Sequence, residues 1–317
     1  MPTGLAVIMP SNLPATLADT TPWTRVVDTF LEAAIDSPNT RRAYRRHLYD
    51  ALGWMGCATL AELHGASLTA YRFHLTSSAL SPASQSQALA ALRAFLRWAQ
   101  SMGAHFLNGD VLRTALRTPK TSVARPYAVL SDREITAVIN ATATPRDRAL
   151  LTVLLGSGLR VSEVVGLDVA DVIEDADGET MLYVRMGKGR KDRTVPIRLE
   201  AALVIRAYLA STGRRLGDDG PLFRAHDRAA SKLPRGRLTA RAVGQLVARV
   251  TQQAGVDAKR ISPHSLRHTY AIRMVRSGAP LVAVQKILGH ASITTTARYA
   301  DHLEMAELRA AIPALPA

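Results

Sequence analysis

The sequence predicts a mainly α-helical protein with one small antiparallel β-sheet, divided into an N-terminal helical bundle and a C-terminal α+β domain. Apolar side chains recur every three or four positions in several segments of both halves, which is the spacing of one face of a helix. One pair of short segments, 180–186 and 193–198, has the pattern of strands, and the stretch GKGRKD between them is typical of a hairpin turn. A polar, proline-containing stretch over 104–126 separates the two halves.

The N-terminal half is predicted to contain a tail, a helical bundle and a linker. Residues 1–21 are rich in proline, threonine and alanine without a period, so we expect a flexible tail. Helical patterns then fill a bundle over 22–103, at 23–35, 37–55, 59–64, 67–77 and 81–103. Residues 104–126 are expected to be the linker to the second domain.

Several helices begin at residues that commonly cap a helix. Asn39 and Thr40 suit the start of the second helix of the bundle, and Ser81 suits the start of its last helix. Ser131 and Glu134 have the spacing of a capping box at the start of the C-terminal half. Further helices are predicted there at 145–156, 160–166, 199–211, 239–254, 263–277 and 280–288.

The stretch GHASITTTARYA, residues 289–300, places His290 and Tyr299 nine positions apart. One unbroken helix would put these two rings on opposite faces. Gly289 is a typical helix stop, however, and Ser292 suits the cap of a new helix. We therefore expect a chain break, with His290 in the corner and Tyr299 about two turns into the next helix, so that both face one site.

The composition indicates a basic protein of a reducing compartment. There are 40 lysines and arginines against 26 acidic residues, which gives a net charge of +14 and a pI near 10.5. Such a charge favours a polyanionic partner, DNA or RNA first, over the alternative of a solvated basic surface. The single cysteine, Cys57, excludes an internal disulfide, and no apolar run has the length of a membrane span. We expect a cytoplasmic protein without a membrane partner.

Two basic clusters are candidates for DNA contact. Arg41, Arg42, Arg45 and Arg46 lie beside the apolar stripe of the helix over 37–55. They form either a solvated face or a set of phosphate contacts, and their uniform sign favours phosphate. The predicted hairpin turn carries the second cluster, with Lys188, Arg190, Lys191 and Arg193. A basic tip can enter a DNA groove, and a solvated turn is the alternative.

Two pairs of residues could hold a phosphate. His264 and Arg267 are three apart in the first turn of a predicted helix, where the helix dipole attracts anions. Arg160 follows two glycines, and Glu163 lies one turn further on, where it can orient that arginine. Each pair alone is a weak signal, because surface His–Arg pairs and helix-end ion pairs are common.

The segments GLRVSE, GKGRKDR, HSLRHTYA and LGHASITTTARYA, in this order, resemble the tyrosine recombinases, the phage-integrase and Xer-type family. The resemblance covers most of 127–303, and the segment 22–103 is similar to the SAM-like core-binding domain of that family. It implies a catalytic domain over 127–300 and a tail over 301–317 that contacts a neighbouring subunit. Packing of the tail on its own domain is the alternative.

The resemblance also implies the chemistry. The catalytic residues would be Arg160, Lys188, His264, Arg267, His290 and the nucleophile Tyr299. Lys191 is a less favoured substitute for Lys188. In the family, the tyrosyl oxygen attacks a DNA phosphodiester and leaves a 3′-phosphotyrosyl bond, without metal, cofactor or ATP. Double-stranded DNA is the implied partner, and the active assembly is a tetramer, either of one chain or with a related recombinase.

The resemblance assigns a task to each group. Arg160 and Arg267 would clamp the non-bridging oxygens, and His290 would donate a further hydrogen bond. Lys188 would protonate the leaving oxygen, and His264 would assist the proton of Tyr299. We expect the helix that carries Tyr299 to be mobile, with the tyrosine not docked against the two arginines in the absence of DNA.

Two other functions remain as alternatives to recombination. A type IB topoisomerase shares the chemistry and only relaxes supercoils, and a non-catalytic DNA-binding protein would share the charge. The sequence leaves open whether a recombinase of this kind acts in DNA integration and excision or in dimer resolution.

Overall fold

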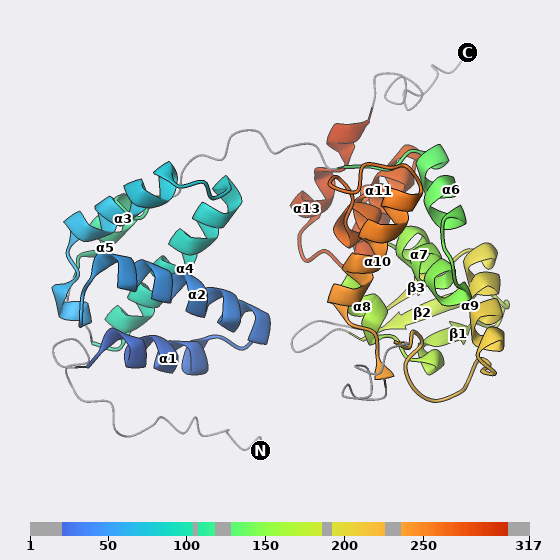
Figure 1. The fold of residues 1–317 in the computed structure, drawn as a ribbon, viewed down its shortest axis with the longest axis horizontal. Helices are drawn as coiled ribbons and strands as arrows, with labels where there is room; N and C mark the ends of the chain where they lie inside the picture. Colours follow the sequence, from blue (N-terminus) through green and yellow to red (C-terminus); the bar gives the residue numbers. More distant parts are fainter. Residues whose placement is uncertain (1–20, 104–106, 118–127, 186–191, 226–235, 304–317) are drawn as a thin grey trace, which may run out of the picture. The chain divides into compact units, whose positions relative to one another are not determined.

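The structure is a computed structural model that describes residues 21–103, 107–117, 128–185, 192–225 and 236–303. The chain divides into two compact units, Met1–Arg125 and Pro126–Ala317. Figure 1 shows an all-helical first unit and a second unit in which helices surround three short strands. Each unit has its own hydrophobic core and is described by itself.

The first unit is a bundle of amphipathic helices. Its elements are α1 (Trp23–Ala34), α2 (Pro38–Met55), the 3-10 turn η1 (Leu60–Glu62), α3 (Gly65–Ser77), α4 (Pro82–Ser101) and α5 (Gly109–Ala115). The apolar stripes predicted from the sequence are the buried faces, as for Phe30 and Leu31 on α1 and Leu89 and Leu92 on α4. The predicted helical bundle is therefore confirmed at the level of its elements.

The N-terminus of α2 differs from the prediction by two to three residues. Ser37 caps this helix, because its hydroxyl accepts a hydrogen bond from the backbone N–H of Thr40 at 3.4 Å. Asn39 and Thr40 were predicted as the caps, and both lie inside the first turn. Pro38 occupies the first helical position, where its missing N–H costs nothing. The cap predicted at Ser81 is confirmed.

Part of the predicted linker over 104–126 is a helix. Residues Gly109–Ala115 form α5, and Asn108 caps it by accepting from the N–H of Asp110. Leu112, Ala115 and Leu116 are buried in the core of the first unit. The prediction of a linker was wrong for this stretch, because a seven-residue helix with few apolar positions gains its stability from packing, which local patterning does not report.

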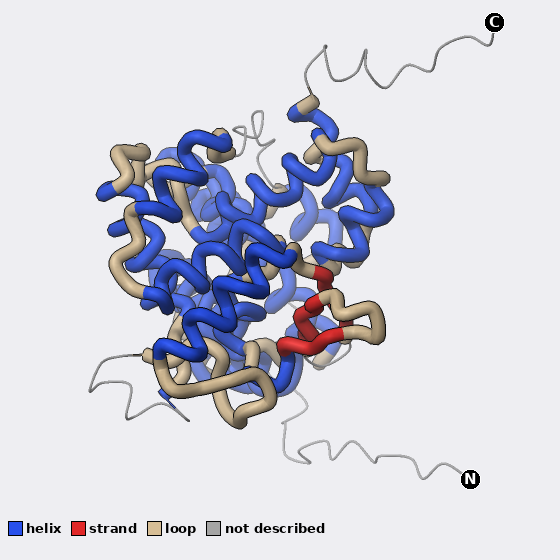
Figure 2. The backbone as a smooth tube through the Cα atoms, turned by 90° about the vertical axis from the view of Figure 1, so that its right-hand side faces the viewer, coloured by secondary structure: helices blue, strands red, loops and turns tan. Residues whose placement is uncertain are grey.

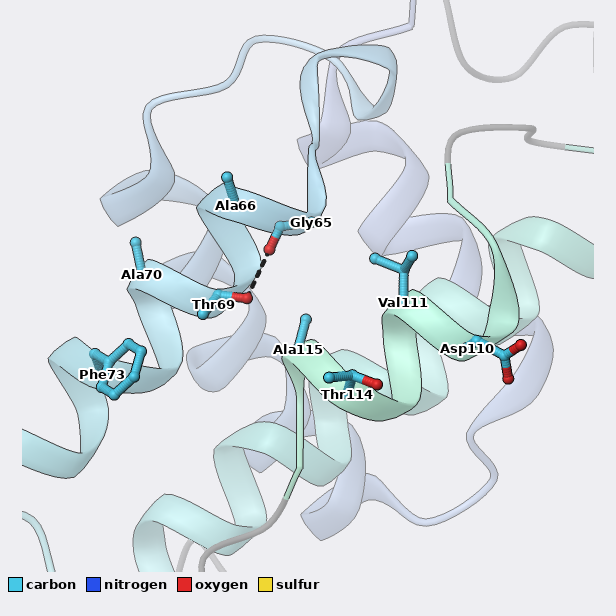
Figure 3. Close-up of a pocket in the computed structure, with 9 residues that line it drawn as sticks. All are labelled: Gly65, Ala66, Thr69, Ala70, Phe73, Asp110, Val111, Thr114 and Ala115. Carbon is cyan, nitrogen blue, oxygen red and sulfur yellow. Dashed lines mark hydrogen bonds between the residues drawn. The ribbon is translucent and has the colours of Figure 1, made fainter.

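A hollow lies between α3 and α5 on this unit. Ala66, Ala70 and Phe73 from α3 face Val111 and Ala115 from α5 across it (Figure 3). Phe73 is 59% exposed. The hollow is apolar and belongs to the N-terminal unit, so it is separate from the constellation of residues described below.

The second unit places helices around a three-stranded antiparallel sheet. Its helices are α6 (Asp132–Asn140), α7 (Pro145–Ser157), α8 (Val161–Gly166), α9 (Leu199–Ser211), α10 (Ala240–Gln253), α11 (Pro263–Arg276), α12 (Leu281–Leu288) and α13 (Ile293–Ala297), with 3-10 turns η2 (Val169–Asp171) and η5 (Ala300–His302). The strands β1 (Val172–Glu174), β2 (Thr180–Val184) and β3 (Arg193–Pro196) lie in that order in the sheet. Figure 2 shows these strands in red.

The sheet has one strand more than predicted. The β2–β3 pair matches the predicted hairpin, with Leu182 opposite Val195. β1 pairs with the other edge of β2, with Val172 opposite Leu182. The sequence does not reveal β1, because three residues are too few to establish an alternating pattern. The buried side chains of all three strands pack into the main core of the unit.

Helix α7 is the central helix of the second unit. It is buried along most of its length, with Leu150, Leu151, Val153 and Leu154 each at most 1% exposed. A helix that is apolar all round must be covered on all sides. It contacts α6, α8, α9 and α11, and its C-terminal cap, Gly158, adjoins the constellation described in the next subsection.

Gly158 occupies a position that no other residue fits. Its φ is +63°, and an added Cβ would lie 2.3 Å from Cδ1 of Tyr270 and 2.9 Å from Cδ2 of Leu288. We expect Gly158→Ala to lower the free energy of unfolding of the second unit by about 2 kcal/mol, through the left-handed backbone and the overlap together. Urea unfolding followed by far-UV circular dichroism measures this change.

Gly213→Ala is the matched control for Gly158→Ala. Gly213 also has a positive φ of +69°, and nothing lies within 4 Å of its added Cβ. This variant therefore reports backbone strain alone, which we expect to cost about 1 kcal/mol. Equal losses in the two variants would show that the overlap with Tyr270 and Leu288 is relieved at no cost.

Within the described ranges, no helix combines the length and the apolar character needed to cross a bilayer.

Candidate active site

The N-terminal part of α11 carries three of the residues that form the site. Ser262 caps the helix by accepting from the N–H of Ser265 at 3.3 Å. The first two turns then carry His264, Arg267 and His268. His264 is exposed, whereas Arg267 and His268 are 2% and 5% exposed. The helix thus buries an arginine and a histidine beneath a surface histidine.

Arg267 is held by backbone carbonyls from two distant segments. Its Nη1 donates to the carbonyl of Gly158, and its Nη2 donates to the carbonyl of Leu288, both at 2.7 Å. Burial, together with the charge of Arg160, lowers the pKa of the Arg267 guanidinium to about 10. The side chain remains a cation near neutral pH, in a fixed orientation.

Arg160 and Glu163 form the pair that their spacing predicted. Arg160 is the N-cap residue of α8, and its backbone N–H donates to Oε2 of Glu163 at 2.8 Å. Its Nη1 donates to Oε1 of the same carboxylate at 2.9 Å and reaches the carbonyl of Leu288 at 3.5 Å. The carboxylate therefore fixes both ends of this arginine.

Arg193 was expected to contact DNA, but its side chain is largely buried within the second unit. Its side chain is 10% exposed, and its Nη1 and Nη2 donate to the two oxygens of Glu163 at 3.1 and 3.0 Å. Its Nε donates to the carbonyl of Ile287 at 2.9 Å. The bidentate pair holds the start of β3 against α8, and the Nε bond holds it against the end of α12. The guanidinium group of Arg193 therefore stabilises the packing of the second unit.

Glu163 is the acceptor shared by these arginines, with Arg267 Nη1 at a longer distance of 3.9 Å. Burial alone would raise the pKa of its carboxyl group. The hydrogen bonds from Arg193 and from the backbone of Arg160, with the charges of both guanidinium groups, outweigh burial and lower the pKa below its ordinary value. Glu163 is therefore ionised at neutral pH.

The end of α12 is where these contacts converge. We call residues Ile287, Leu288, Gly289 and His290 the α12 corner. The two apolar residues supply the carbonyls that accept from Arg160, Arg193 and Arg267. Three cations thus lie at the C-terminal end of the helix, where its dipole favours positive charge. The glycine has φ +64°, which ends the helix as predicted.

His290 leaves the α12 corner and turns towards α13. Its Nδ1 lies 2.9 Å from the hydroxyl oxygen of Thr296, and its backbone carbonyl accepts from Gln285 at 3.1 Å. Ser292 caps α13 by accepting from the N–H of Thr294. The predicted chain break and new helix are therefore confirmed.

Tyr299 lies just beyond α13, and not within it as predicted. The helix ends at Ala297, and Tyr299 precedes the 3-10 turn η5. The ring is 3% exposed and packs in a small core with Ile272, Val275 and Leu288. Its ring centroid lies 6.1 Å from that of His290 in a stacked arrangement. The two rings that the sequence separates by nine positions do face one another.

The hydroxyl oxygen of Tyr299 lies 3.0 Å from Nδ1 of His268. Among the described residues, neither Arg160 nor Arg267 donates a hydrogen bond to this hydroxyl, and His264 makes none with it. The expectations that the tyrosine is undocked in the absence of DNA and that its segment is mobile both stay predictions.

His268 is the site residue that the sequence analysis missed. It follows Arg267 directly in HSLRHTYA, and a residue four positions after His264 shares a helix face with it. That spacing was the available signal. What it could not indicate is that Tyr299, 31 residues further on, meets this face.

The remaining predicted residues divide into two groups. Lys188, Arg190 and Lys191 lie outside the described residues. On α2, Arg42 and Arg46 are exposed and form no ion pair with another described residue. Arg45 pairs with Asp28 at 3.2 Å, and the guanidinium of Arg41 donates to the carbonyl of Ile35 at 2.7 Å.

The described His, Cys, Asp and Glu side chains include no group of three or more that could hold a metal ion.

Comparison with protein families now adds to this geometry. Residues 128–305 match the model of the phage integrase family, and residues 28–103 match its N-terminal SAM-like domain. The chain belongs to the phage integrase family. It is a tyrosine recombinase, an enzyme that cleaves and rejoins DNA strands.

Two curated recombinases illustrate the likeness in sequence. Tyrosine recombinase XerA of Thermococcus kodakarensis is 33% identical over 289 residues, which cover 89% of this chain and 93% of the relative. Tyrosine recombinase XerC of Pelobacter propionicus is 37% identical over 273 residues, which cover 83% and 84%. Both matches extend across the two units.

Solved structures of recombinases share the fold. The post-cleavage complex of XerH recombinase with a palindromic difH substrate has a TM-score of 0.68 at 18% identity, covering 91% of this chain and 84% of that one. A Tn1549 transposon integrase in complex with a circular intermediate DNA has a TM-score of 0.70 at 18% identity, covering 92% and 98%. The predicted fold class, a helical bundle joined to an α+β catalytic domain, is confirmed.

Proposed function

We propose that this recombinase cleaves DNA by attack of Tyr299 on a phosphodiester, forming a 3′-phosphotyrosyl bond and releasing a 5′-hydroxyl. One observation carries the proposal. Arg160, Arg267, His290 and Tyr299, which come from four separate segments, all meet at the α12 corner. These are four of the residues that the family resemblance implies for strand cleavage, and their convergence on one corner of the fold supports the proposal.

The roles follow from the charge that develops during the reaction. Negative charge builds on the non-bridging oxygens in the transition state, and fixed cations stabilise it better than water does. Arg160 and Arg267 are held by Glu163 and by backbone carbonyls, so their orientation is set before DNA binds. Glu163 supports both, and His290 supplies a further donor.

Proton transfer involves two further groups. Lys188 protonates the leaving 5′-oxygen, and His264 assists the removal of the proton from the hydroxyl of Tyr299. Partial desolvation of the ring and the charges of Arg267 and Arg160 lower the pKa of His264, so its imidazole is neutral and can accept a proton at neutral pH. The phosphotyrosyl bond retains the energy of the broken linkage, so rejoining needs neither ATP nor a metal or other cofactor.

Trapping the covalent intermediate tests the proposal. The protein is incubated with sheared genomic DNA, denatured in detergent, and the DNA that stays attached is sequenced to define the site. Mass spectrometry of the attached peptide is expected to place the nucleotide on Tyr299. A modification on another residue, or the absence of any attached DNA, would refute the assignment.

A duplex pair carrying the recovered site then separates recombination from topoisomerase activity. We expect strand exchange between two linear sites. Relaxation of supercoils without exchange would favour a type IB topoisomerase, and binding without cleavage would favour a non-catalytic DNA-binding protein.

The assembly proposed for exchange is a tetramer on two DNA duplexes, formed by this chain alone or with a related recombinase. Solved structures with this fold include XerH recombinase bound to a difH substrate and a lambda integrase dimer bound to a COC′ core site. Residues 301–317 are proposed to contact the neighbouring subunit. Integration and excision of mobile DNA, or dimer resolution, in the cytoplasm is the proposed setting.

Arg42 and Arg46 are expected to contribute phosphate contacts. They lie one turn apart on α2, are exposed, and form no ion pair within the described part of the chain. Replacing both by alanine should weaken binding to any duplex and reduce the slope of log K against log salt by about 2, one for each lost phosphate contact. Fluorescence anisotropy with an unrelated duplex at several salt concentrations measures the slope.

The matched control removes the same charge elsewhere in the first unit. Arg72 donates to the carbonyl of Thr114, and Arg113 pairs with Asp110. The double variant Arg72→Ala, Arg113→Ala should leave the slope nearly unchanged. Equal slopes for the two double variants would mean that net charge, and not contact by α2, sets the affinity.

A further inference from the structure

Tyr299 and His268 form a buried hydrogen-bonded pair. The hydroxyl oxygen and Nδ1 are 3.0 Å apart, and the two residues are 3% and 5% exposed. Water competes little for a bond at this depth, so the bond constrains the phenol more than a surface bond would. The atom that it constrains is the one proposed to attack DNA.

The histidine lies between the tyrosine and the rest of the phosphate-binding face of α11. Its ring centroid is 4.0 Å from that of His264 and 5.5 Å from that of Tyr299. On the tyrosine, His290 stacks at 6.1 Å. The phenol is therefore fixed through its oxygen by one histidine and contacts a second through its ring.

Proton chemistry does not explain this contact. Burial, with the neighbouring His264, Arg267 and His290, lowers the pKa of His268 to about 3. A base this weak is poorly matched to a phenol, whose ordinary pKa is about 10. The imidazole stays neutral at working pH, and the bond fixes the phenol oxygen whichever of the two atoms carries the hydrogen.

Packing alone does not explain the contact either. A residue that only filled this space would gain most from an apolar side chain, because burying a polar ring requires partners for its nitrogen atoms. The imidazole instead directs Nδ1 at the hydroxyl. The chemistry of the side chain, and not only its volume, is used at this position.

We propose that His268 is a positioning residue, which holds the hydroxyl of Tyr299 on the face of α11 that carries His264 and Arg267 and so sets the nucleophile for attack. This inference rests on the proposed function, in which Tyr299 forms the covalent bond. It predicts that the loss of Nδ1 slows the covalent step and leaves DNA affinity unchanged.

Two substitutions separate the hydrogen bond from the space. His268→Leu removes Nδ1 and keeps an apolar side chain of similar size. His268→Asn places an amide group close to where Nδ1 lies, and the amide can donate or accept. The asparagine variant is thus the conservative rescue, and the leucine variant is the test.

The first measurement is single-turnover formation of the covalent adduct on a nicked duplex carrying the recovered site, with DNA affinity measured separately by anisotropy. We expect His268→Leu to slow adduct formation by about a hundredfold, the loss typical of a misplaced reacting group. His268→Asn should recover most of the rate, and both variants should bind DNA as the wild type does.

The second measurement does not depend on activity. Tyrosine labelled with carbon-13 at Cζ reports the hydrogen bonding of each hydroxyl by NMR in the DNA-free protein, and Tyr299→Phe assigns the signal. We expect the Tyr299 signal to shift in His268→Leu and to return towards its wild-type position in His268→Asn.

Several results would overturn the inference. An unchanged rate in His268→Leu would show that the bond is dispensable, and a faster rate would show that it restrains the tyrosine. Equal losses of rate in the two variants would show that His268 acts only through packing. A wild-type protein that forms no adduct would instead refute the proposed function, and the NMR signal would then still decide whether His268 holds the hydroxyl.

Discussion

Tyr299→Phe is expected to abolish covalent attachment to DNA while the protein still folds and binds its site. The substitution removes one oxygen and keeps the ring that packs against Ile272, Val275 and Leu288. Loss of the bond to His268 should cost about 1 kcal/mol of stability. Adduct formation on a nicked duplex should fall by about 10⁴-fold or more, because loss of a nucleophile removes the reaction path itself.

Tyr270→Phe is the matched control for Tyr299→Phe. Tyr270 lies on α11, close to Gly158, and among the described residues its hydroxyl has no hydrogen-bond partner. This variant should form the adduct at nearly the wild-type rate. Adduct formation by the Tyr299→Phe protein, or loss of its DNA binding, would contradict the assignment of Tyr299 as the nucleophile.

Glu163→Gln is expected to have the largest effect on stability. The carboxylate is 9% exposed and receives hydrogen bonds from Arg160 and Arg193, with Arg267 nearby. Its neutral isostere would leave several guanidinium groups without their counter-charge, and breaking a buried pair in this way costs about 4 kcal/mol. The arginines would also lose their fixed orientation, so adduct formation should slow together with the loss of stability.

Urea unfolding can assign the loss to the correct unit. The three tryptophans, Trp23, Trp54 and Trp98, all lie in the first unit, so their fluorescence follows that unit alone. Far-UV circular dichroism follows both units. We expect Glu163→Gln to shift the dichroism transition and to leave the fluorescence transition in place.

Glu174→Gln is the control for that experiment. Glu174 pairs with Arg206 on the surface, where both side chains are more than 40% exposed. Exposed pairs contribute about 1 kcal/mol or less, so this variant should unfold almost as the wild type does. A comparable loss of stability in the two variants would show that burial does not increase the contribution of the Glu163 ion pairs.

The same carboxylate makes stability depend on pH. Its pKa is lower in the folded state than the ordinary value of 4.5, so folding favours the ionised form. The resulting stabilisation is complete above pH 4.5 and is lost as the pH falls through the folded pKa. In that acidic range the wild type should lose stability more steeply than Glu163→Gln, and an equal slope would contradict the lowered pKa.

Much of the fold could be predicted because its signals are local. Helices α7, α9 and α11 follow apolar periodicity or runs, and the capping box of Ser131 and Glu134 is formed as predicted. The break at Gly289 likewise follows from a glycine and the capping residues beyond it. In each case the residues that determine the structure are neighbours in the chain.

Other features depend on contacts between distant segments and could not be predicted in this way. Helix α5 exists because Leu112 and Leu116 are buried by the bundle. Arg193 looked like part of a basic surface turn, and its partner Glu163 lies 30 residues earlier. The contact of His268 with Tyr299 arises only when the segment that carries Tyr299 and η5 packs against α11. The roles of the catalytic residues came from the family resemblance, because geometry alone assigns no order of events.

The contacts of Arg160 and Arg267 also determine when during folding a functional centre can exist. Arg267 reaches a carbonyl 109 residues earlier, and Arg160 reaches one 128 residues later. Contacts with such long sequence separation form late, after most of the loop-closure entropy has been lost. A chain still emerging from the ribosome, or one trapped partly folded, therefore cannot bring its cations together. DNA cleavage that depends on these cations therefore requires the whole second unit to be folded.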